Sequence, residues 1–135
     1  MHRTKSGFTM VEIIIVVVML GIMAAIAIPK VLAPTERVRA SEGMQILSTL
    51  MGAQKRYALE NNGQYSDGNC SVLDVSIPTS VNFLAPTCFN IPTYVANISR
   101  IGFGYTLYID ESGAIKCAPA GADCSAACKG GTVCN

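Results

Sequence analysis

The feature of this sequence that most constrains its fold is an apolar run near the start. Every residue from Ile13 to Ile28 is Ile, Val, Met, Leu, Ala or Gly, and Glu12 is the only charge between Phe8 and Ile28. The segment from Phe8 to Ile28 has about the 20 residues that a helix needs to cross the hydrocarbon core of a bilayer. We therefore expect residues 8–28 to form a membrane-spanning helix.

A short basic segment precedes this run. Residues 1–7 carry His2, Arg3 and Lys5 and contain no acid. Basic residues beside a membrane span favour the cytoplasmic side of the membrane. We expect residues 1–7 to be a cytoplasmic leader and the chain beyond the span to lie outside the cytoplasm.

A helical period of apolar residues continues after the span, between Thr35 and Leu59. Pro29 and Pro34 would ordinarily break a helix. If they only kink it, one helix runs from about Phe8 to about Asn61, and the Asn-Asn-Gly sequence of residues 61–63 ends it. The expected buried face comprises Val38, Met44, Leu47, Leu50, Met51 and Ala58. The charged residues of the same stretch are expected to form a solvated face: Glu36, Arg37, Arg39, Glu42, Lys55, Arg56 and Glu60.

The second half of the chain has the composition of a small β-rich domain. Residues 63–97 are rich in Ser, Asn, Pro, Thr and Gly and predict mostly loop with one short strand. Apolar residues alternate over 101–109, with Phe103, Tyr105, Leu107 and Ile109 on one face, and a polar turn over 110–113 leads to a second strand over 114–117. This is a hairpin pattern.

The expected fold class is α+β. A long N-terminal helix, first hydrophobic and then amphipathic, carries a small C-terminal antiparallel β-sheet head stapled by disulfides. The expected divisions are a leader over 1–7, a span or filament-core helix over 8–28, its amphipathic continuation over 29–62, and the head over 63–135.

Six cysteines lie in the second half of the chain. An even number of cysteines in a small loop-rich region after an export-type N-terminus predicts disulfides and an oxidising compartment. A metal site would need closely paired Cys or His ligands, but the only histidine is His2 in the leader, so metal binding and free thiols are less favoured. Several pairings remain open, and Cys70 with Cys88 is the one we favour. The candidates are Cys70, Cys88, Cys117, Cys124, Cys128 and Cys134.

Glu12 is an unfavourable residue for a membrane span. A carboxylate near mid-bilayer costs roughly 2.5–3.5 kcal/mol or more, and it needs a partner. If the chain were cut between Gly7 and Phe8, the new α-amino group of Phe8 would lie one helical turn from Glu12. The amine could then pair with Glu12 of its own chain or of a neighbouring one, which would favour assembly over an unpaired monomer.

Residues 5–12, Lys-Ser-Gly-Phe-Thr-Met-Val-Glu, followed by the apolar run and Pro29, closely resemble the prepilin signature of type IV pilins and type II secretion pseudopilins. The resemblance implies that a prepilin peptidase cuts after Gly7 on the cytoplasmic face and methylates the amine of Phe8. It also implies that Glu12 guides subunit docking and that Pro29 kinks the helix. The short leader and Phe8 resemble the type IVa branch.

The function that this resemblance implies is structural. The expected product is a type IV pilus used for adhesion, twitching motility or DNA uptake, and the expected partners are the peptidase, other copies of the chain, other pilins, an inner-membrane assembly platform and, before assembly, membrane lipid. The precursor would be a single-pass inner-membrane protein with its head outside the cytoplasm, and the product an extracellular pilus or a periplasmic pseudopilus.

Other functions have less support in the sequence. The chain shows no cofactor motif and no convergent set of catalytic groups, so we expect no enzyme, no cofactor and no metal. Ten Lys and Arg against nine Asp and Glu leave no strong charge for nucleic acid.

Three alternatives stay open. A pseudopilin of a type II secretion system has the same N-terminus. A secretory signal peptide could be cleaved near Ala25-Ile26-Ala27, and a plain single-pass anchor could carry a binding module that never polymerises. Glu12 is unnecessary for either of the last two and is therefore the residue that distinguishes them from a pilin.

Overall fold

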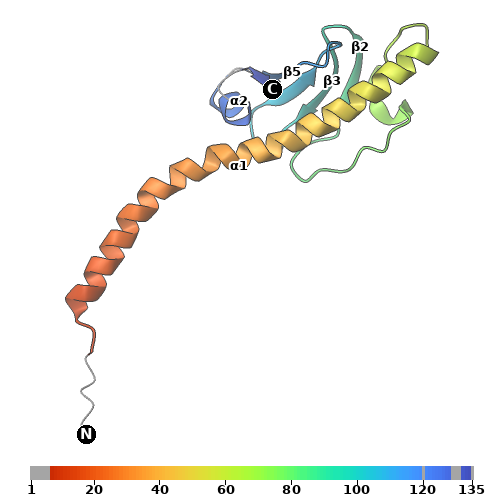
Figure 1. Cartoon of the computed structure of the whole chain (residues 1–135). Coiled ribbons are helices and arrows are strands. Elements are labelled where there is room, and N and C mark those ends of the chain that lie inside the picture. The colour runs from red at the N-terminus through yellow and green to blue at the C-terminus, as the bar shows by residue number, and fades with distance from the viewer. Residues whose placement is uncertain (1–6, 120, 129–131, 135) are drawn as a thin grey trace. The chain divides into compact units, whose positions relative to one another are not determined.

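The chain is built on one long helix, α1, which spans Met10–Glu60 (Figure 1). The computed structural model describes residues 7–119, 121–128 and 132–134, without the side chains of residues 28–33 and 122. The chain divides into two compact units, Met1–Ala33 and Pro34–Asn135. Most of the expected leader, residues 1–6, lies outside the described residues.

Helix α1 begins and ends close to the expected residues. It starts at Met10 rather than Phe8, because the hydroxyl of Thr9 accepts a hydrogen bond from the backbone N–H of Glu12 at 3.3 Å and so caps the first turn. It ends at Glu60, after which Asn62 and Gly63 adopt positive φ angles of 56° and 82°. The N–H of Gly63 closes the end by donating to the carbonyl of Ala58 at 2.7 Å.

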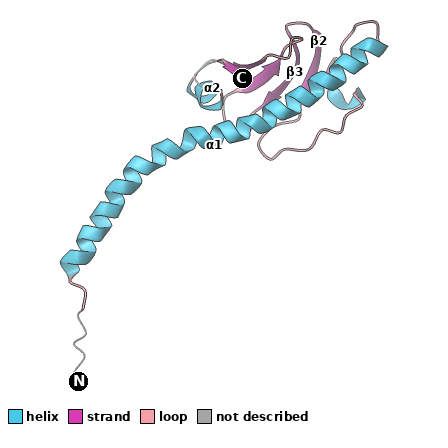
Figure 2. Cartoon of the chain, in the orientation of Figure 1, coloured by secondary structure: helices cyan, strands magenta, loops and turns pink. Residues whose placement is uncertain are grey.

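The head contains a six-stranded antiparallel sheet whose strands follow chain order from one edge to the other (Figure 2). Two short helical turns accompany it: η1, Cys70–Val72, and α2, Ala122–Ala127. The strands are β1 Gly68–Asn69, β2 Thr87–Ile91, β3 Tyr94–Ser99, β4 Thr106–Ile109, β5 Ile115–Ala118 and β6 Val133–Cys134.

The expected hairpin is confirmed, with β4 paired to β5 so that Leu107 faces Cys117 and Ile109 faces Ile115. Phe103 does not share the buried face, because β4 begins only at Thr106 and the preceding residues turn. Residues 63–97 are mostly loop, as expected, but they contain β1, β2 and the first part of β3 rather than one short strand. Val95 and Ala96 are adjacent and both fully buried, so β3 lacks the simple alternation that marks a strand in a sequence.

The core forms where one stripe of α1 packs on the sheet. The stripe recurs at intervals of four and three residues and consists of Glu36, Ala40, Gly43, Leu47, Leu50 and Gln54, all buried. Leu47, Leu50, Met51 and Ala58 are buried as expected, but Val38 is 72% exposed, so its assignment to the buried face is wrong. Val38 lies about 200° around the helix from Glu36, on the far side from the stripe.

The stripe has polar residues at both ends. At its C-terminal end, the amide of Gln54 donates to the carbonyls of Ser66 and Val95 at 3.0 and 3.1 Å and accepts from the N–H of Ser66 at 2.8 Å. Burying this amide therefore leaves its hydrogen-bonding groups satisfied. It ties α1 both to the loop after the helix and to the central strand β3.

The six cysteines form three disulfides, Cys70–Cys88, Cys117–Cys124 and Cys128–Cys134, with Cα–Cα distances of 5.3, 5.7 and 4.6 Å. The first links η1 to β2. The other two hold α2 and β6 against β5, so the Gly- and Ala-rich C-terminal segment, which has little apolar bulk of its own, is fixed to the sheet.

Replacing Gly43 with valine is expected to destabilise the head by about 1–3 kcal/mol, because the space next to Gly43 is filled by Phe83 and Leu107. A Cβ at Gly43 would lie 2.8 Å from Cζ of Phe83 and 3.1 Å from Cδ1 of Leu107. The free energy of unfolding of the full chain in detergent, followed by circular dichroism against denaturant concentration, measures the change.

Gly52, also in α1, provides the matched control for this prediction. Its Cβ would meet only Nη1 of Arg56 at 3.7 Å, an ordinary contact. Because alanine is the better helix former, Gly52→Ala should leave stability unchanged or raise it by up to ~1 kcal/mol. Equal losses at Gly43 and Gly52 would show that close packing at Gly43 is not the cause.

Candidate assembly site

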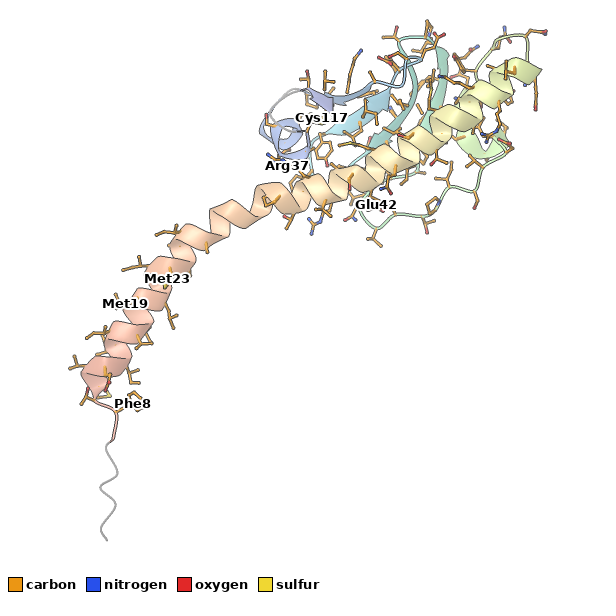
Figure 3. All side chains as sticks on the ribbon, viewed as in Figure 1. Phe8, Met19, Met23, Arg37, Glu42 and Cys117 are labelled. Carbon is orange, nitrogen blue, oxygen red and sulfur yellow. A yellow bond between two sulfur atoms is a disulfide. The ribbon has the colours of Figure 1, made fainter. Side chains whose placement is uncertain are left out.

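The N-terminal stretch of α1 is apolar on all sides and uncovered. None of Met10–Ala27 is buried within the single chain, and this stretch is long and apolar enough to cross a membrane. The side chains of Phe8, Met19 and Met23 point away from the ribbon (Figure 3). Ile13 is 50% exposed, whereas Leu47, further along the same helix, is 0% exposed.

Such a surface is unfavourable in water. Burying one Val, Leu or Ile side chain contributes roughly 1.5–3 kcal/mol, and this stretch holds many of them. An exposed apolar surface of this extent marks a contact with membrane or with protein. The stretch therefore needs a cover, and lipid or other copies of the same helix have the right chemistry.

Glu12 is the one acid within Met10–Ala27, and it lies in the first turn of α1. Its backbone N–H is bonded to the Thr9 hydroxyl, which places Glu12 at the third helical position.

Phe8 precedes the helix and is 79% exposed. In the described residues no hydrogen bond or ion pair joins Phe8 to Glu12. In the intact chain the nitrogen of Phe8 is an amide bonded to Gly7, so no cation exists at this position to pair with Glu12. The pairing expected from the sequence therefore requires a cut between Gly7 and Phe8, and it stays a prediction.

Pro29 lies inside α1, whose helical backbone continues through it. Its side chain is outside the described part of the chain. The expected kink at this position stays a prediction.

A buried charge network ties the head's helix, the part of α1 that follows Pro34, to the chain between β3 and β4. The sequence did not predict this network. Glu36, Arg100 and Tyr105 are 3%, 7% and 2% exposed. Nε and Nη2 of Arg100 donate to the two carboxylate oxygens of Glu36 at 2.6 and 3.3 Å, and the Tyr105 hydroxyl donates to Oε1 of Glu36 at 2.8 Å. The expectation of a solvated face is therefore wrong for Glu36.

The remaining donors of Arg100 are also satisfied. Its Nη1 donates to the carbonyls of Asn82 and Ile101 at 2.7 and 2.9 Å. Its guanidinium lies 5.7 Å from the ring centroid of Phe83 and 5.1 Å from that of Phe103. Arg100 therefore joins helix, loop and sheet through one side chain.

The network fixes its own protonation states. Burial raises the pKa of Glu36, but hydrogen bonds from Arg100 and Tyr105 outweigh burial and hold this pKa below its ordinary value. Burial, aided by the hydrogen bond to Glu36, raises the pKa of the Tyr105 phenol well above its ordinary value. Glu36 is thus charged and Tyr105 remains a donor over the physiological range.

One sequence signal could have revealed Glu36. It continues the four-and-three spacing of the buried stripe one step before Ala40, so the pattern places a carboxylate on the apolar face. The exposed Arg56, by contrast, pairs with Asp74 on the surface at 2.8 Å, as a solvated residue would.

The described residues contain no group of three or more His, Cys, Asp or Glu arranged to hold a metal ion. The features that remain as a site are the apolar stretch, its single acid and the Gly7–Phe8 junction.

The model of the prokaryotic N-terminal methylation motif matches residues 2–28, the segment that contains this junction, Glu12 and the apolar stretch. In this N-terminal segment, the chain is similar to type IV pilins and type II secretion pseudopilins.

Curated members of this pilin and pseudopilin family align with the chain from both branches. The type II secretion system core protein G of Pseudomonas aeruginosa is 36% identical over 44% of this chain and 42% of its own length. A type IV major pilin protein of Neisseria gonorrhoeae is 32% identical over 60% of this chain and 48% of its own length. The type IV wide pilus major component of Thermus thermophilus is 30% identical over 60% of this chain and 63% of its own length.

The chain spans about two fifths to two thirds of the length of these relatives. No solved structure matches the chain significantly. The arrangement of the pilin-type head, including its three disulfides and the buried network, comes from the structure itself.

Proposed function

We propose that this chain is a prepilin that is cut after Gly7, N-methylated at Phe8 and polymerised into a type IV pilus. The observation that carries the proposal is the uncovered apolar stretch Met10–Ala27, with its one acid at Glu12, directly after the Gly7–Phe8 junction. Membrane lipid covers this stretch in the precursor, and neighbouring subunits cover it in the filament.

Cleavage supplies what assembly needs. The cut converts the amide of Phe8 into a cationic amine, which pairs with Glu12 of a neighbouring subunit as the two enter a low-dielectric filament core. Each subunit presents one surface to the subunit before it and a different surface to the one after it. Such a heterologous, non-closing contact builds a helical filament.

The other partners of the proposal follow from the same path. A prepilin peptidase recognises the junction, and an inner-membrane assembly platform moves the subunit from the bilayer into the filament, alone or beside other pilins. The head, fixed by its disulfides, forms the filament surface, where adhesion, twitching motility or DNA uptake would act. These relatives are pilus subunits, which supports a structural role rather than catalysis.

A secretion pseudopilin is the second candidate, because core protein G is among the relatives. We favour the pilus because the alignments with the two type IV pilins cover 60% of the chain, against 44% for core protein G. Both candidates are processed and polymerise in the same way. They differ in location, because a pilus extends outside the cell and a pseudopilus stays in the periplasm.

Intact mass and N-terminal sequencing of the protein sheared from the surface of native cells test the proposal. The expected product begins at a methylated Phe8, while unsheared membranes of the same cells serve as the control for uncut precursor. Processed chain found only in the cell fraction would favour the pseudopilus. A product that begins at Ile28, or an uncut chain confined to the membrane, would contradict polymerisation of either kind.

A further inference from the structure

The head has a cluster of exposed apolar side chains around the buried charge network. We call Val81, Ile101 and Phe103 the base patch; they are 89%, 43% and 41% exposed. The N–H of Ile101 donates to the carbonyl of Asn82, next to Val81, at 2.9 Å, and Phe103 lies over the Arg100 guanidinium. Arg100 is hydrogen-bonded to Glu36, so the patch lies beside the residue that anchors α1 to the head.

Chain connectivity limits how far this part of the head can lie from the membrane. Glu36 follows Ala27, the last residue of the candidate span, by nine residues, which reach at most about 30 Å even when fully extended. The sequence between them stays apolar from Ile28 to Ala33 except at Lys30. The apolar segment therefore ends three residues before Glu36 in the sequence.

Two arginines follow Glu36 on α1. Arg37 is exposed, and Arg39, whose side chain is 49% exposed, lies 3.6 Å from Glu36 in an ion pair (Figure 3 labels Arg37). The acids of this region are hydrogen-bonded within the head: Glu36 is buried against Arg100, and Glu42 accepts from the side chain of Asn82 at 2.8 Å. Asp123 accepts from the N–H of Gly104 at 3.2 Å.

From these observations we propose that the base patch, with Arg37 and Arg39, docks the head on the headgroup region of an anionic phospholipid bilayer before assembly. Apolar side chains that enter the acyl boundary, flanked by arginines, are the chemistry of interfacial membrane contacts. Entry into the filament would then require the head to leave the lipid surface. This inference rests on membrane insertion of the span, as in the proposed function, but not on cleavage or polymerisation.

The absence of tryptophan from the chain allows a direct test. Phe103→Trp places a single fluorescent reporter in the base patch. Ile91→Trp is the matched control, because Ile91 is 39% exposed, close to the 41% of Phe103, but lies in the β2–β3 hairpin at the other end of β3 from Arg100. Each full-length variant is reconstituted into phosphatidylglycerol and phosphatidylethanolamine vesicles, with or without bromine near the headgroup end of the acyl chains.

In the brominated vesicles Phe103→Trp should lose several-fold more emission than Ile91→Trp, and its emission maximum should move to shorter wavelength. Ile101→Trp is a second reporter in case the first disturbs the network, and a thiol assay confirms that all three disulfides are intact. Equal, weak quenching at both ends of the head would overturn the proposal. A blue shift without quenching by lipid bromine would do so as well, because it would indicate a second copy of the head as the occupant.

Flotation of the vesicles separates this inference from the proposed function. A chain that floats with vesicles but shows no quenching at Phe103→Trp sinks the base-patch proposal alone. A chain that does not float contradicts membrane insertion and with it both proposals. Quenching of Phe103→Trp in a chain that is never processed in cells would support the base-patch proposal and contradict the proposal of a pilus.

Discussion

Glu12→Ala should abolish filaments while leaving the chain in the membrane. In an assembled core the variant leaves the Phe8 amine of each subunit buried without its partner, and removal of one member of a buried pair costs about 3–5 kcal/mol. At 1.4 kcal/mol per factor of ten, each subunit addition would weaken roughly 100-fold or more. Insertion should not suffer, because the variant also removes the ~2.5–3.5 kcal/mol cost of a carboxylate in the bilayer.

The measurement is the amount of this chain in the sheared surface fraction relative to the membrane fraction. Glu60→Ala is the matched control, because Glu60 is an exposed acid of the same helix and lies at its C-terminal end. Filaments at normal yield from Glu12→Ala would favour a plain anchor with a binding head over a pilin.

Arg100→Met should be the most destabilising single change in the head. It leaves the carboxylate of Glu36 buried at 3% exposure without a cation, and such unpaired charges cost about 3–5 kcal/mol. It also removes the donors to the carbonyls of Asn82 and Ile101. Denaturant unfolding of the full chain in detergent gives the change in the free energy of unfolding.

Two comparisons isolate the buried pair as the cause. Arg56→Met breaks an exposed pair with Asp74 and should change stability little, since solvent screens such pairs. The double variant Glu36→Gln with Arg100→Met should recover part of the loss, because no buried charge is left. If Arg56→Met and Arg100→Met were equally harmful, burial of the pair would not be the reason.

The acid dependence of stability provides a further measurement of the same pair. The folded pKa of Glu36 lies below its ordinary value of 4.5, so its contribution is fully present above that pH and is lost as pH falls through the folded pKa. The stability difference between the native chain and Glu36→Gln should therefore shrink on acidification below about pH 4.5. A difference that stays constant over this range would contradict a charged Glu36.

The local features of this protein were predictable because they depend on residues close in sequence. The span, the helix stop at Asn61 to Gly63 and the β4–β5 hairpin each follow from composition or from a period within about twenty residues. The N-terminal motif is likewise local, since its junction, its acid and its apolar run are contiguous.

Other features depended on contacts between distant segments. Strand β3 is a strand because it pairs with both β2 and β4, although Val95 and Ala96 break its alternation. The exposure of Val38 depends on the side of α1 that the sheet covers, which the helical period alone left open.

The sequence by itself determined that this chain has a membrane-length apolar helix with one acid, a long helical continuation and a cysteine-stapled head. Only the tertiary structure decided that Glu36 is buried. Its partners, the cation Arg100 and the hydrogen-bond donor Tyr105, lie 64 and 69 residues later in the sequence. A charge is expected at the surface unless a partner is known. The fold supplies these partners because the chain between β3 and β4, which carries Arg100 and Tyr105, packs against α1 at Glu36.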